Sequence, residues 1–183
     1  PDLMLPPDIA ICSSCLSEIF DEKDKRYDYP FTTCLKCGPR YSLLTGLPYD
    51  RAKTTMADLS MCPSCKREYN DISGQRHHSQ TNSCPECTIP MKWYNSEGEV
   101  LCNEATDILL EIKKVLLDGN IVAIKGVGGY LLLCDATNEL AIETLRKRKH
   151  RPAKPFALLY PSISSAEKDV FLTEPEITAL KST

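Results

Sequence analysis

Two stretches decide the fold of the first half of this chain: they read Cys12-Ser-Ser-Cys15 and Cys34-Leu-Lys-Cys37, with eighteen residues between them. The same arrangement returns fifty positions later as Cys62-Pro-Ser-Cys65 and Cys84-Pro-Glu-Cys87, without a gap. Repetition at a fixed offset is typical of two copies of one small structural unit. We therefore interpret the first ninety residues as a tandem repeat.

The repeat extends beyond the cysteines. At the same offset of fifty, Phe20 falls on Asn70, so the match is not complete. Four other positions carry the same or a similar residue in both copies: Glu18 and Glu68, Asp21 and Asp71, Arg26 and Arg76, Thr33 and Ser83. These matches support a shared fold and not only a shared metal-binding spacing.

Each copy has the spacing of a four-cysteine zinc site, in which two Cys-x2-Cys turns supply the ligands. Four thiolates about 2.3 Å from zinc fill its tetrahedral shell and leave no position for water. We therefore predict two structural Zn2+ ions, because catalytic zinc needs an open position. Small units with few large apolar side chains need a bound metal to fold. Zinc supplies on the order of 10 kcal/mol of folding free energy in comparable peptides. The predicted ligands are Cys12, Cys15, Cys34, Cys37, Cys62, Cys65, Cys84 and Cys87.

Several alternatives stay open at this level. Disulfides would explain an even number of cysteines but do not require doubled Cys-x2-Cys spacing, and iron in a rubredoxin-like site would use the same ligands. The first Cys-x2-Cys could also share a metal with the fourth; we favour one metal per repeat, because the duplication carries four ligands as a set. His77 and His78 lie inside the second repeat. We expect them to be solvated or hydrogen-bonded, because the thiolate count is already complete.

Composition narrows the class of protein. The net charge of -3 and the pI near 5.7 lack the positive field of a dedicated nucleic-acid binder. We see no apolar run of about 18 residues and no signal peptide, and we expect a cytoplasmic protein with no membrane partner. In that reducing compartment ten cysteines favour metal over disulfides. The abrupt ends of the sequence suggest a piece of a longer protein.

The organisation of the chain changes near residue 100, because eight of the ten cysteines come before residue 88. We predict a zinc-finger domain at 1–95, with repeats at about 8–45 and 58–95, and a second domain at 96–183. The expected fold class is two small zinc-stabilised tandem C4 fingers followed by a partial α/β domain.

Periodicity predicts the elements of the second half. We expect a helix over 108–116 ended by Gly119, a buried strand at 121–125 and a glycine turn at 126–129, whereas 130–134 is ambiguous between strand and helix. A helix capped by Asn138 should run through Arg148, and a strand should follow at 156–160. Two further helices are predicted from capping boxes: Ser164 with Glu167, and Thr173 with Glu176. Alternating helices and short strands indicate an α/β layer architecture.

Two features of the second half could hold an anion. One is the glycine turn, where a ligand can approach the backbone. The other is the basic loop 149–154, because six of the 22 lysines and arginines fall between positions 146 and 154. A glycine turn is often only a turn and a charge run is often a solvated face. No Walker lysine motif and no complete Rossmann fingerprint is present.

Taken in order, the motifs resemble the HypF family of hydrogenase maturation factors. Besides the doubled cysteine repeat, the resemblance rests on Cys37-Gly-Pro-Arg-Tyr41, Pro48-Tyr-Asp-Arg51, Ile124-Lys-Gly-Val-Gly-Gly-Tyr130, Cys134-Asp-Ala-Thr-Asn138 and Arg148-Lys-His-Arg-Pro-Ala-Lys-Pro155. It implies that the fingers at 1–95 precede the N-terminal part of a YrdC-like α/β domain. It also implies that this domain binds ATP with Mg2+ and adenylates carbamate, derived from carbamoyl phosphate.

The resemblance further implies transfer of the carbamoyl group to the partner HypE, where it becomes the cyanide ligand of [NiFe] hydrogenase. The family's phosphate-binding Lys-x-Arg pair and following lysine match Lys149, Arg151 and Lys154, and Lys125 falls at the substrate loop. No catalytic residue is assigned, and this piece alone is expected to be an incomplete enzyme. The alternative functions are a zinc-ribbon and YrdC-like RNA-binding module, and a protein docking surface on the fingers.

Overall fold

The computed structural model describes residues 6–182 except 88 and 127. The chain divides into two compact units. One comprises the chain up to Asn103 together with the glycine turn at 126–129, and the other comprises Glu104–Lys125 and the chain from Tyr130 onward. Within the described residues, none of the helices is long and apolar enough to cross a bilayer.

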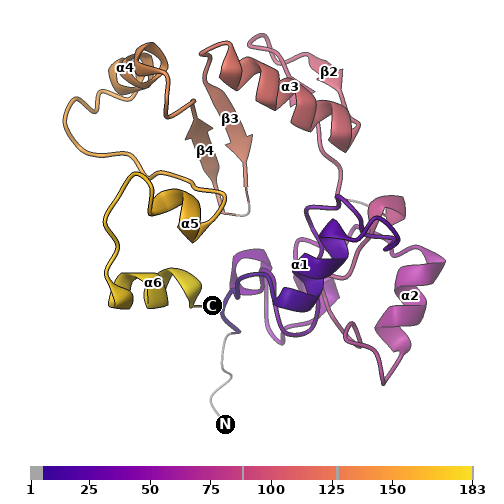
Figure 1. The fold of residues 1–183 in the computed structure, drawn as a ribbon. Coiled ribbons are helices and arrows are strands. Elements are labelled where there is room, and N and C mark those ends of the chain that lie inside the picture. The colour runs from indigo at the N-terminus through magenta and orange to yellow at the C-terminus, as the bar shows by residue number, and fades with distance from the viewer. Residues whose placement is uncertain (1–5, 88, 127, 183) are drawn as a thin grey trace. The chain divides into compact units, whose positions relative to one another are not determined.

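In the part that the structure describes, the first unit is built from two short helices and their flanking turns (Figure 1). Helix α1 spans Ser13–Phe20 and helix α2 spans Pro63–Asn70, and each begins directly after the first cysteine of its repeat. Among the described residues, 3-10 turns η1 at Tyr41–Leu43 and η2 at Arg51–Lys53 lie between the two helices, and η3 at Pro85–Cys87 follows α2. A short antiparallel hairpin, β1 at Trp93–Tyr94 and β2 at Val100–Cys102, ends the unit. The predicted domain boundary after residue 95 falls in the turn of this hairpin.

The duplication is visible in the backbone as well as in the sequence. Asp28 and His78, fifty positions apart, both have positive φ, at 54° and 52°. Their N–H groups donate to the carbonyls of Ile19 and Tyr69, in both cases at 2.9 Å. Positive φ is uncommon for residues other than glycine. Its recurrence at matched positions therefore shows that the two repeats share one backbone path.

The interior of this unit contains sulfur and polar side chains more than hydrocarbon. Arg26 is 2% exposed and Asn82 is fully buried. Among the residues that the structure describes, the buried hydrophobic ones of this unit are Cys15, Tyr29, Cys34, Cys37, Met56, Cys65 and Cys84. Five of these seven are cysteines of the two repeats, as expected for a unit that replaces an apolar core with metal.

Among its described residues, the second unit has four helices and one antiparallel hairpin (Figure 1). Helix α3 spans Ala105–Leu117 and contacts β3, Val122–Lys125, which pairs with β4, Tyr130–Leu133, from Val122 opposite Leu133 to Lys125 opposite Tyr130. Helices α4, α5 and α6 follow at Glu139–Arg148, Ile163–Ala166 and Glu174–Lys181. Its buried apolar residues, within the described range, are Ile108, Val122, Ala141, Leu145 and Ala166.

Most predicted elements of the second unit are confirmed. Asn138 caps α4 by accepting from Ala141 N–H, and Thr173 and Glu176 form the capping box of α6. Gly119 follows α3 with φ of +76°, where an added Cβ would meet the Asn138 side chain at 2.8 Å. The ambiguous segment at 130–134 forms a strand, β4. The predicted strand at 121–125 forms as β3, but only Val122 is buried within it.

Two predictions for the later elements were wrong. Residues 156–160 form no strand, because no described strand pairs with them and prolines at 155 and 161 remove backbone donors at both ends. The helix expected from Ser164 is a single turn, α5, and Ser162 caps it by accepting from Ser165 N–H. Glu167 lies at the C-terminal end of that turn, so the Ser164 and Glu167 pair is not a capping box.

Candidate metal centres

The cysteines of the first repeat converge on one point. Cys12, Cys15, Cys34 and Cys37 place their four sulfurs within 4.8 Å of one another. The Cys34 sulfur lies 3.7 Å from that of Cys12 and 3.8 Å from that of Cys37. Cys15, Cys34 and Cys37 are buried, and Cys12 is half-buried. The first repeat thus forms one compact sulfur group, which we call the first centre.

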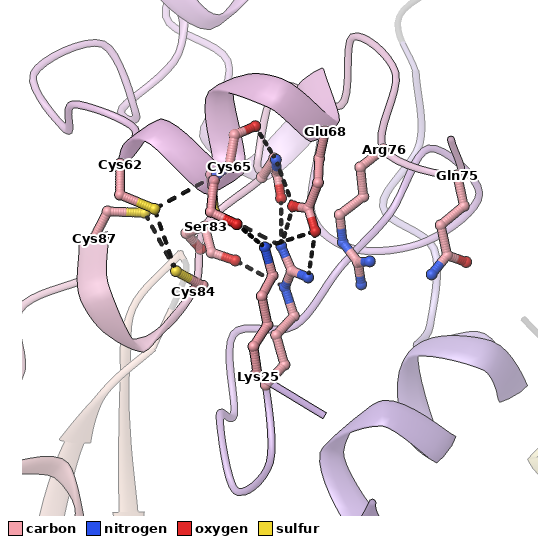
Figure 2. A network of polar contacts seen from close by, with 12 residues as sticks. Lys25, Cys62, Cys65, Glu68, Gln75, Arg76, Ser83, Cys84 and Cys87 are labelled. Atoms are coloured by element: carbon pink, nitrogen blue, oxygen red, sulfur yellow. Dashed lines mark hydrogen bonds and ion pairs between the residues drawn. The ribbon is translucent and has the colours of Figure 1, made fainter. Parts of the chain in front are cut away.

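The second repeat forms an equivalent group from Cys62, Cys65, Cys84 and Cys87, which we call the second centre. Figure 2 shows the sulfurs of Cys62, Cys84 and Cys87 turned toward one another. The Cys84 sulfur lies 3.6 Å from that of Cys62 and 3.9 Å from that of Cys87. The two centres therefore have nearly the same dimensions.

These dimensions fit a tetrahedral metal. Ligands about 2.3 Å from a central zinc lie about 3.8 Å from one another along each edge of the tetrahedron. The four sulfur separations given above run from 3.6 to 3.9 Å. A disulfide would need about 2.05 Å, and all ten cysteines are free of such bonds. The disulfide alternative is therefore wrong. The sulfurs group by repeat and are not interleaved. Each centre is compatible with one zinc ion, which makes two for the chain.

The local backbone sets the spacing of each sulfur pair. Cys12 and Cys62 occupy the positions that precede α1 and α2, so Cys15 and Cys65 lie in the first helical turn, where the helix dipole favours thiolate. Burial raises the pKa of the Cys15 and Cys65 thiols. Metal binding must therefore displace protons from these two sulfurs, as it does at other thiolate centres.

Gly38 allows the chain to turn directly after the first centre. Its φ is +98°, and an added Cβ would lie 2.6 Å from Cγ2 of Thr33. Gly38 also exchanges two backbone hydrogen bonds with Ile9, at 2.8 and 3.1 Å. These bonds bring the segment before Cys12 alongside the turn that carries Cys37. A glycine is required here by both conformation and space.

Each centre is contacted by an arginine from the opposite repeat. Arg26 of the first repeat donates from Nη2 to the Cys65 sulfur at 3.7 Å and from Nε to the Ser83 carbonyl at 3.0 Å. Arg26 also forms an ion pair of 2.6 Å with Glu68 of α2. Lys25 reaches the same carboxylate at 2.6 Å, as Figure 2 shows. Burial would raise the Glu68 pKa, but hydrogen bonds from Arg26 and Lys25 hold it at about 2.

Arg76 of the second repeat makes the matching contacts to the first centre. Its Nη2 lies 3.8 Å from the Cys15 sulfur, and its Nε donates to the Thr33 carbonyl at 3.0 Å. Glu18 of α1 holds the guanidinium through both carboxylate oxygens. The match of Arg26 with Arg76 and of Glu18 with Glu68 was visible in the sequence. Sequence reasoning gave these four residues no role, because the exchange between repeats is a tertiary feature.

Two other features concern the second repeat: Arg51, which precedes it, and the histidine pair within it. Arg51 donates to the backbone carbonyls of Leu59, Gln80 and Asn82, and burial lowers its pKa. His77 and His78 stand outside both cysteine groups. The His78 ring lies 4.8 Å from that of Tyr69. His78 is exposed, in agreement with the solvated role expected for it.

The predicted nucleotide residues fall on two elements of the second unit. Lys149 ends α4, and Arg151 and Lys154 lie in the loop that follows. Arg151 donates to the carbonyls of Lys154 at 3.3 Å and Pro155 at 2.8 Å, and its guanidinium lies over the Phe156 ring. Arg146 also donates to the Lys154 carbonyl, at 3.1 Å. The loop is therefore folded around its own cationic side chains.

Lys125 belongs to a different element, the end of β3. Its ammonium lies 5.7 Å from the centre of the Tyr130 ring on β4. The glycine turn between these two residues is closed by a 2.8 Å hydrogen bond from Gly126 N–H to the Gly129 carbonyl. The remaining part of this predicted feature, Val127, lies outside the described residues.

Comparison with known proteins identifies the family. A family model described as HypF finger matches residues 11–44 and 61–94, one copy for each repeat. A second, Sua5_yciO_yrdC, described as telomere recombination, matches residues 114–183. Carbamoyltransferase HypF of Rhodobacter capsulatus is 49% identical over 153 residues, which cover 84% of this chain and 20% of the relative. The chain belongs to the HypF family.

Solved HypF structures share the fold. HypF of T. kodakarensis matches all of this chain and 24% of its own, with a TM-score of 0.93 and 41% identity. A full-length HypF in a phosphate- and nucleotide-bound form matches 96% of this chain and 23% of its own, with a TM-score of 0.86 and 41% identity. The predicted family and fold class, C4 fingers followed by part of a YrdC-like domain, are confirmed. The carbamoyltransferase names do not favour the RNA-binding alternative.

The matches cover only a small part of each relative. The chain spans about a fifth of the length of the curated relative from Rhodobacter capsulatus. Within HypF it corresponds to the finger pair and the part of the YrdC-like domain that follows.

Proposed function

We propose that this chain is the part of a HypF carbamoyltransferase in which a zinc-stabilised finger pair precedes the segment that binds ATP and activates carbamate. The observation that carries the proposal is the basic loop after α4, in a chain 41% identical to a HypF solved with phosphate and nucleotide bound. The proposed domains are 1–95 and 96–183.

The finger pair is proposed as a scaffold with two structural Zn2+ ions, held by the eight cysteines of the two centres. Four thiolates per metal leave no open position, so these ions take no part in the transfer chemistry. We prefer zinc to iron for two reasons. The chain matches a finger family, and a closed four-thiolate site with a structural role suits a metal without redox chemistry.

Lys149, Arg151 and Lys154 are proposed to hold the nucleotide phosphates, with Lys125 at the carbamate side. Adenylation of carbamate develops negative charge at the α-phosphorus and releases pyrophosphate, and fixed cations stabilise that charge. The loop is suited to this because two carbonyl contacts already orient the Arg151 guanidinium. A preoriented fork loses little freedom when it binds an oxyanion. Mg2+ is proposed to accompany ATP, as it does at other phosphoryl sites.

Carbamoyl phosphate is the proposed source of carbamate, and HypE in the cytoplasm is the proposed acceptor of the carbamoyl group. The test is exchange of labelled pyrophosphate into ATP by the full-length protein. Exchange that requires carbamoyl phosphate is expected, because formation of carbamoyladenylate is reversible. Exchange without that substrate, or none with it, would contradict the proposal.

A further inference from the structure

Arg26 and Arg76 make crossed contacts that the proposed scaffold role does not require. We propose that they are positioning residues acting in trans: each guanidinium holds together the two cysteine pairs of the other finger's metal centre. The inference rests on the proposal that both centres bind metal. It adds that neither finger holds its metal at full affinity without the arginine of its neighbour.

The geometry of each arginine supports this role. Its Nη2 atom contacts a sulfur of the first cysteine pair of a centre, and its Nε atom contacts the backbone next to the second pair. Arg26 contacts the sulfur of Cys65, which is in the first turn of α2, at 3.7 Å. It also binds the carbonyl of Ser83, the residue directly before Cys84, at 3.0 Å. One planar group thus spans the helix-borne pair and the turn-borne pair. Rotation of either pair would break one of the two contacts.

Arg76 repeats the arrangement in the reverse direction. It contacts Cys15 in α1 at 3.8 Å and the carbonyl of Thr33, directly before Cys34, at 3.0 Å. The matching distances differ by no more than 0.1 Å between the two fingers. A chance surface contact has no reason to recur at the equivalent position. The recurrence indicates that the duplication preserved an exchanged contact.

Charge also favours these contacts. Four thiolates around a divalent metal carry a net charge of about -2, which is costly to bury without a nearby cation. The Arg26 side chain is 2% exposed and the Arg76 side chain 5%, so solvent contributes little there. Each guanidinium lies between the sulfur group and a carboxylate, Glu68 or Glu18. A lysine could match the charge but not the fork that binds sulfur, carbonyl and carboxylate together.

Nearby side chains keep Arg26 in place on the second finger. Asn82 accepts from Arg26 Nη2 at 3.0 Å and donates to the Cys65 carbonyl at 3.0 Å. This link ties the arginine to the backbone of the ligand as well as to its sulfur. Outer contacts of this kind orient metal ligands, and their loss costs about 10- to 100-fold in metal affinity at other centres.

The test asks which finger loses metal when one arginine is removed. Arg26→Ala, Arg76→Ala and an exposed control, Arg67→Ala on α2, are prepared in the 183-residue chain loaded with two zinc ions. The proteins are challenged with EDTA in the presence of N-ethylmaleimide, and the labelled cysteines are identified by peptide mass spectrometry. Arg26→Ala should label the Cys62 set first, and Arg76→Ala the Cys12 set first, each about 10- to 100-fold faster than in wild type. Arg67→Ala should match wild type.

Two outcomes would overturn the inference. One is that the cysteines of the mutated finger itself are labelled first, and the other is that both sets are labelled equally fast. Arg26→Lys and Arg76→Lys provide milder variants if the alanine variants fail to fold. They should show the same crossed order, because an ammonium keeps the charge without the fork, and full recovery of wild-type rates would contradict the role of geometry. Native mass spectrometry of the wild type separates the two proposals. Absence of metal there refutes the zinc scaffold, whereas two metals with uncrossed release refute only the exchange.

Discussion

The Nη2 atom of Arg26 lies 3.7 Å from the sulfur of Cys65, although these residues are 39 positions apart and belong to different fingers. Since Arg76 makes the reciprocal contact to Cys15, loading one finger with metal should order the residues that support the other. We therefore expect positive coupling between the two centres. With one equivalent of zinc per chain, native mass spectrometry should find fewer singly loaded molecules than the roughly one half expected for independent sites. A singly loaded fraction at or above that level would argue against coupling.

Removing one ligand should cost one metal. Cys34→Ser takes a buried sulfur from the first centre, and a hydroxyl is a poor ligand for structural zinc. We expect a loss of one zinc equivalent in native mass spectrometry and loss of structure in the first repeat. Cys134→Ser, which lies outside both centres, is the control and should keep two zincs. Retention of two metals by Cys34→Ser would show that this cysteine is not a ligand.

Gly38→Ala should weaken the first centre through the backbone. The residue has φ of +98°, and the new Cβ would lie 2.6 Å from Thr33 Cγ2. We expect a loss on the order of 2–3 kcal/mol in urea unfolding, together with faster zinc release. Gly98→Ala is a matched control, because Gly98 has φ of +84° but no atom within 4 Å of the added Cβ. It should lose only about 1 kcal/mol, so equal losses would exclude the contact with Thr33 as the cause.

Glu68→Gln tests the charge that holds Arg26. The Glu68 pKa is about 2, below its ordinary value of 4.5, because the hydrogen bonds from Arg26 and Lys25 outweigh burial. The carboxylate thus stabilises the fold fully above about pH 4.5, and this contribution is lost as the pH falls toward 2. We expect Glu68→Gln to be less stable by on the order of 2–3 kcal/mol, equally at pH 6, 7 and 8. A difference that changes across this range would indicate that another titrating group is responsible.

Arg151→Ala should impair nucleotide chemistry and leave the fingers intact. Its guanidinium is the proposed phosphate ligand and also binds the carbonyls of Lys154 and Pro155. In the full-length protein we expect pyrophosphate exchange to fall at least about tenfold, as when other transition-state donors are removed, with two zincs retained. Arg148→Ala, an exposed neighbour on α4, is the control and should exchange normally. Normal exchange by Arg151→Ala would remove this residue from the site.

Local patterns in the sequence predicted much of this chain. The Asn138 cap of α4, the capping box of Thr173 with Glu176 and the glycine after α3 depend on residues within a few positions of one another. The four-cysteine spacing is similarly informative, because a Cys-x2-Cys turn places two sulfurs on one side of a metal whatever surrounds it. The sequence alone was therefore enough for these elements and for the candidate ligands.

The misassigned strand at 156–160 shows where local patterns fail. Its apolar residues suit a strand, but a strand forms only where another strand lies alongside to exchange backbone hydrogen bonds, and among the described residues none pairs with this segment. Arginines at 146 and 151 instead lie over Phe156 and fold the segment as a loop. Such pairing is decided by long-range contacts that no short window of sequence contains.

The sequence by itself determined that there are two fingers, which cysteines could bind metal and where helices α4 and α6 begin. Only the tertiary structure decided that the sulfurs group by repeat and that Arg26 and Arg76 cross between the repeats. The physical reason is the distance along the sequence between the residues that interact. Caps and ligand turns are formed by neighbours along the chain, whereas a buried guanidinium must find sulfur, carbonyl and carboxylate together, and here only the packing of one finger against the other supplies all three.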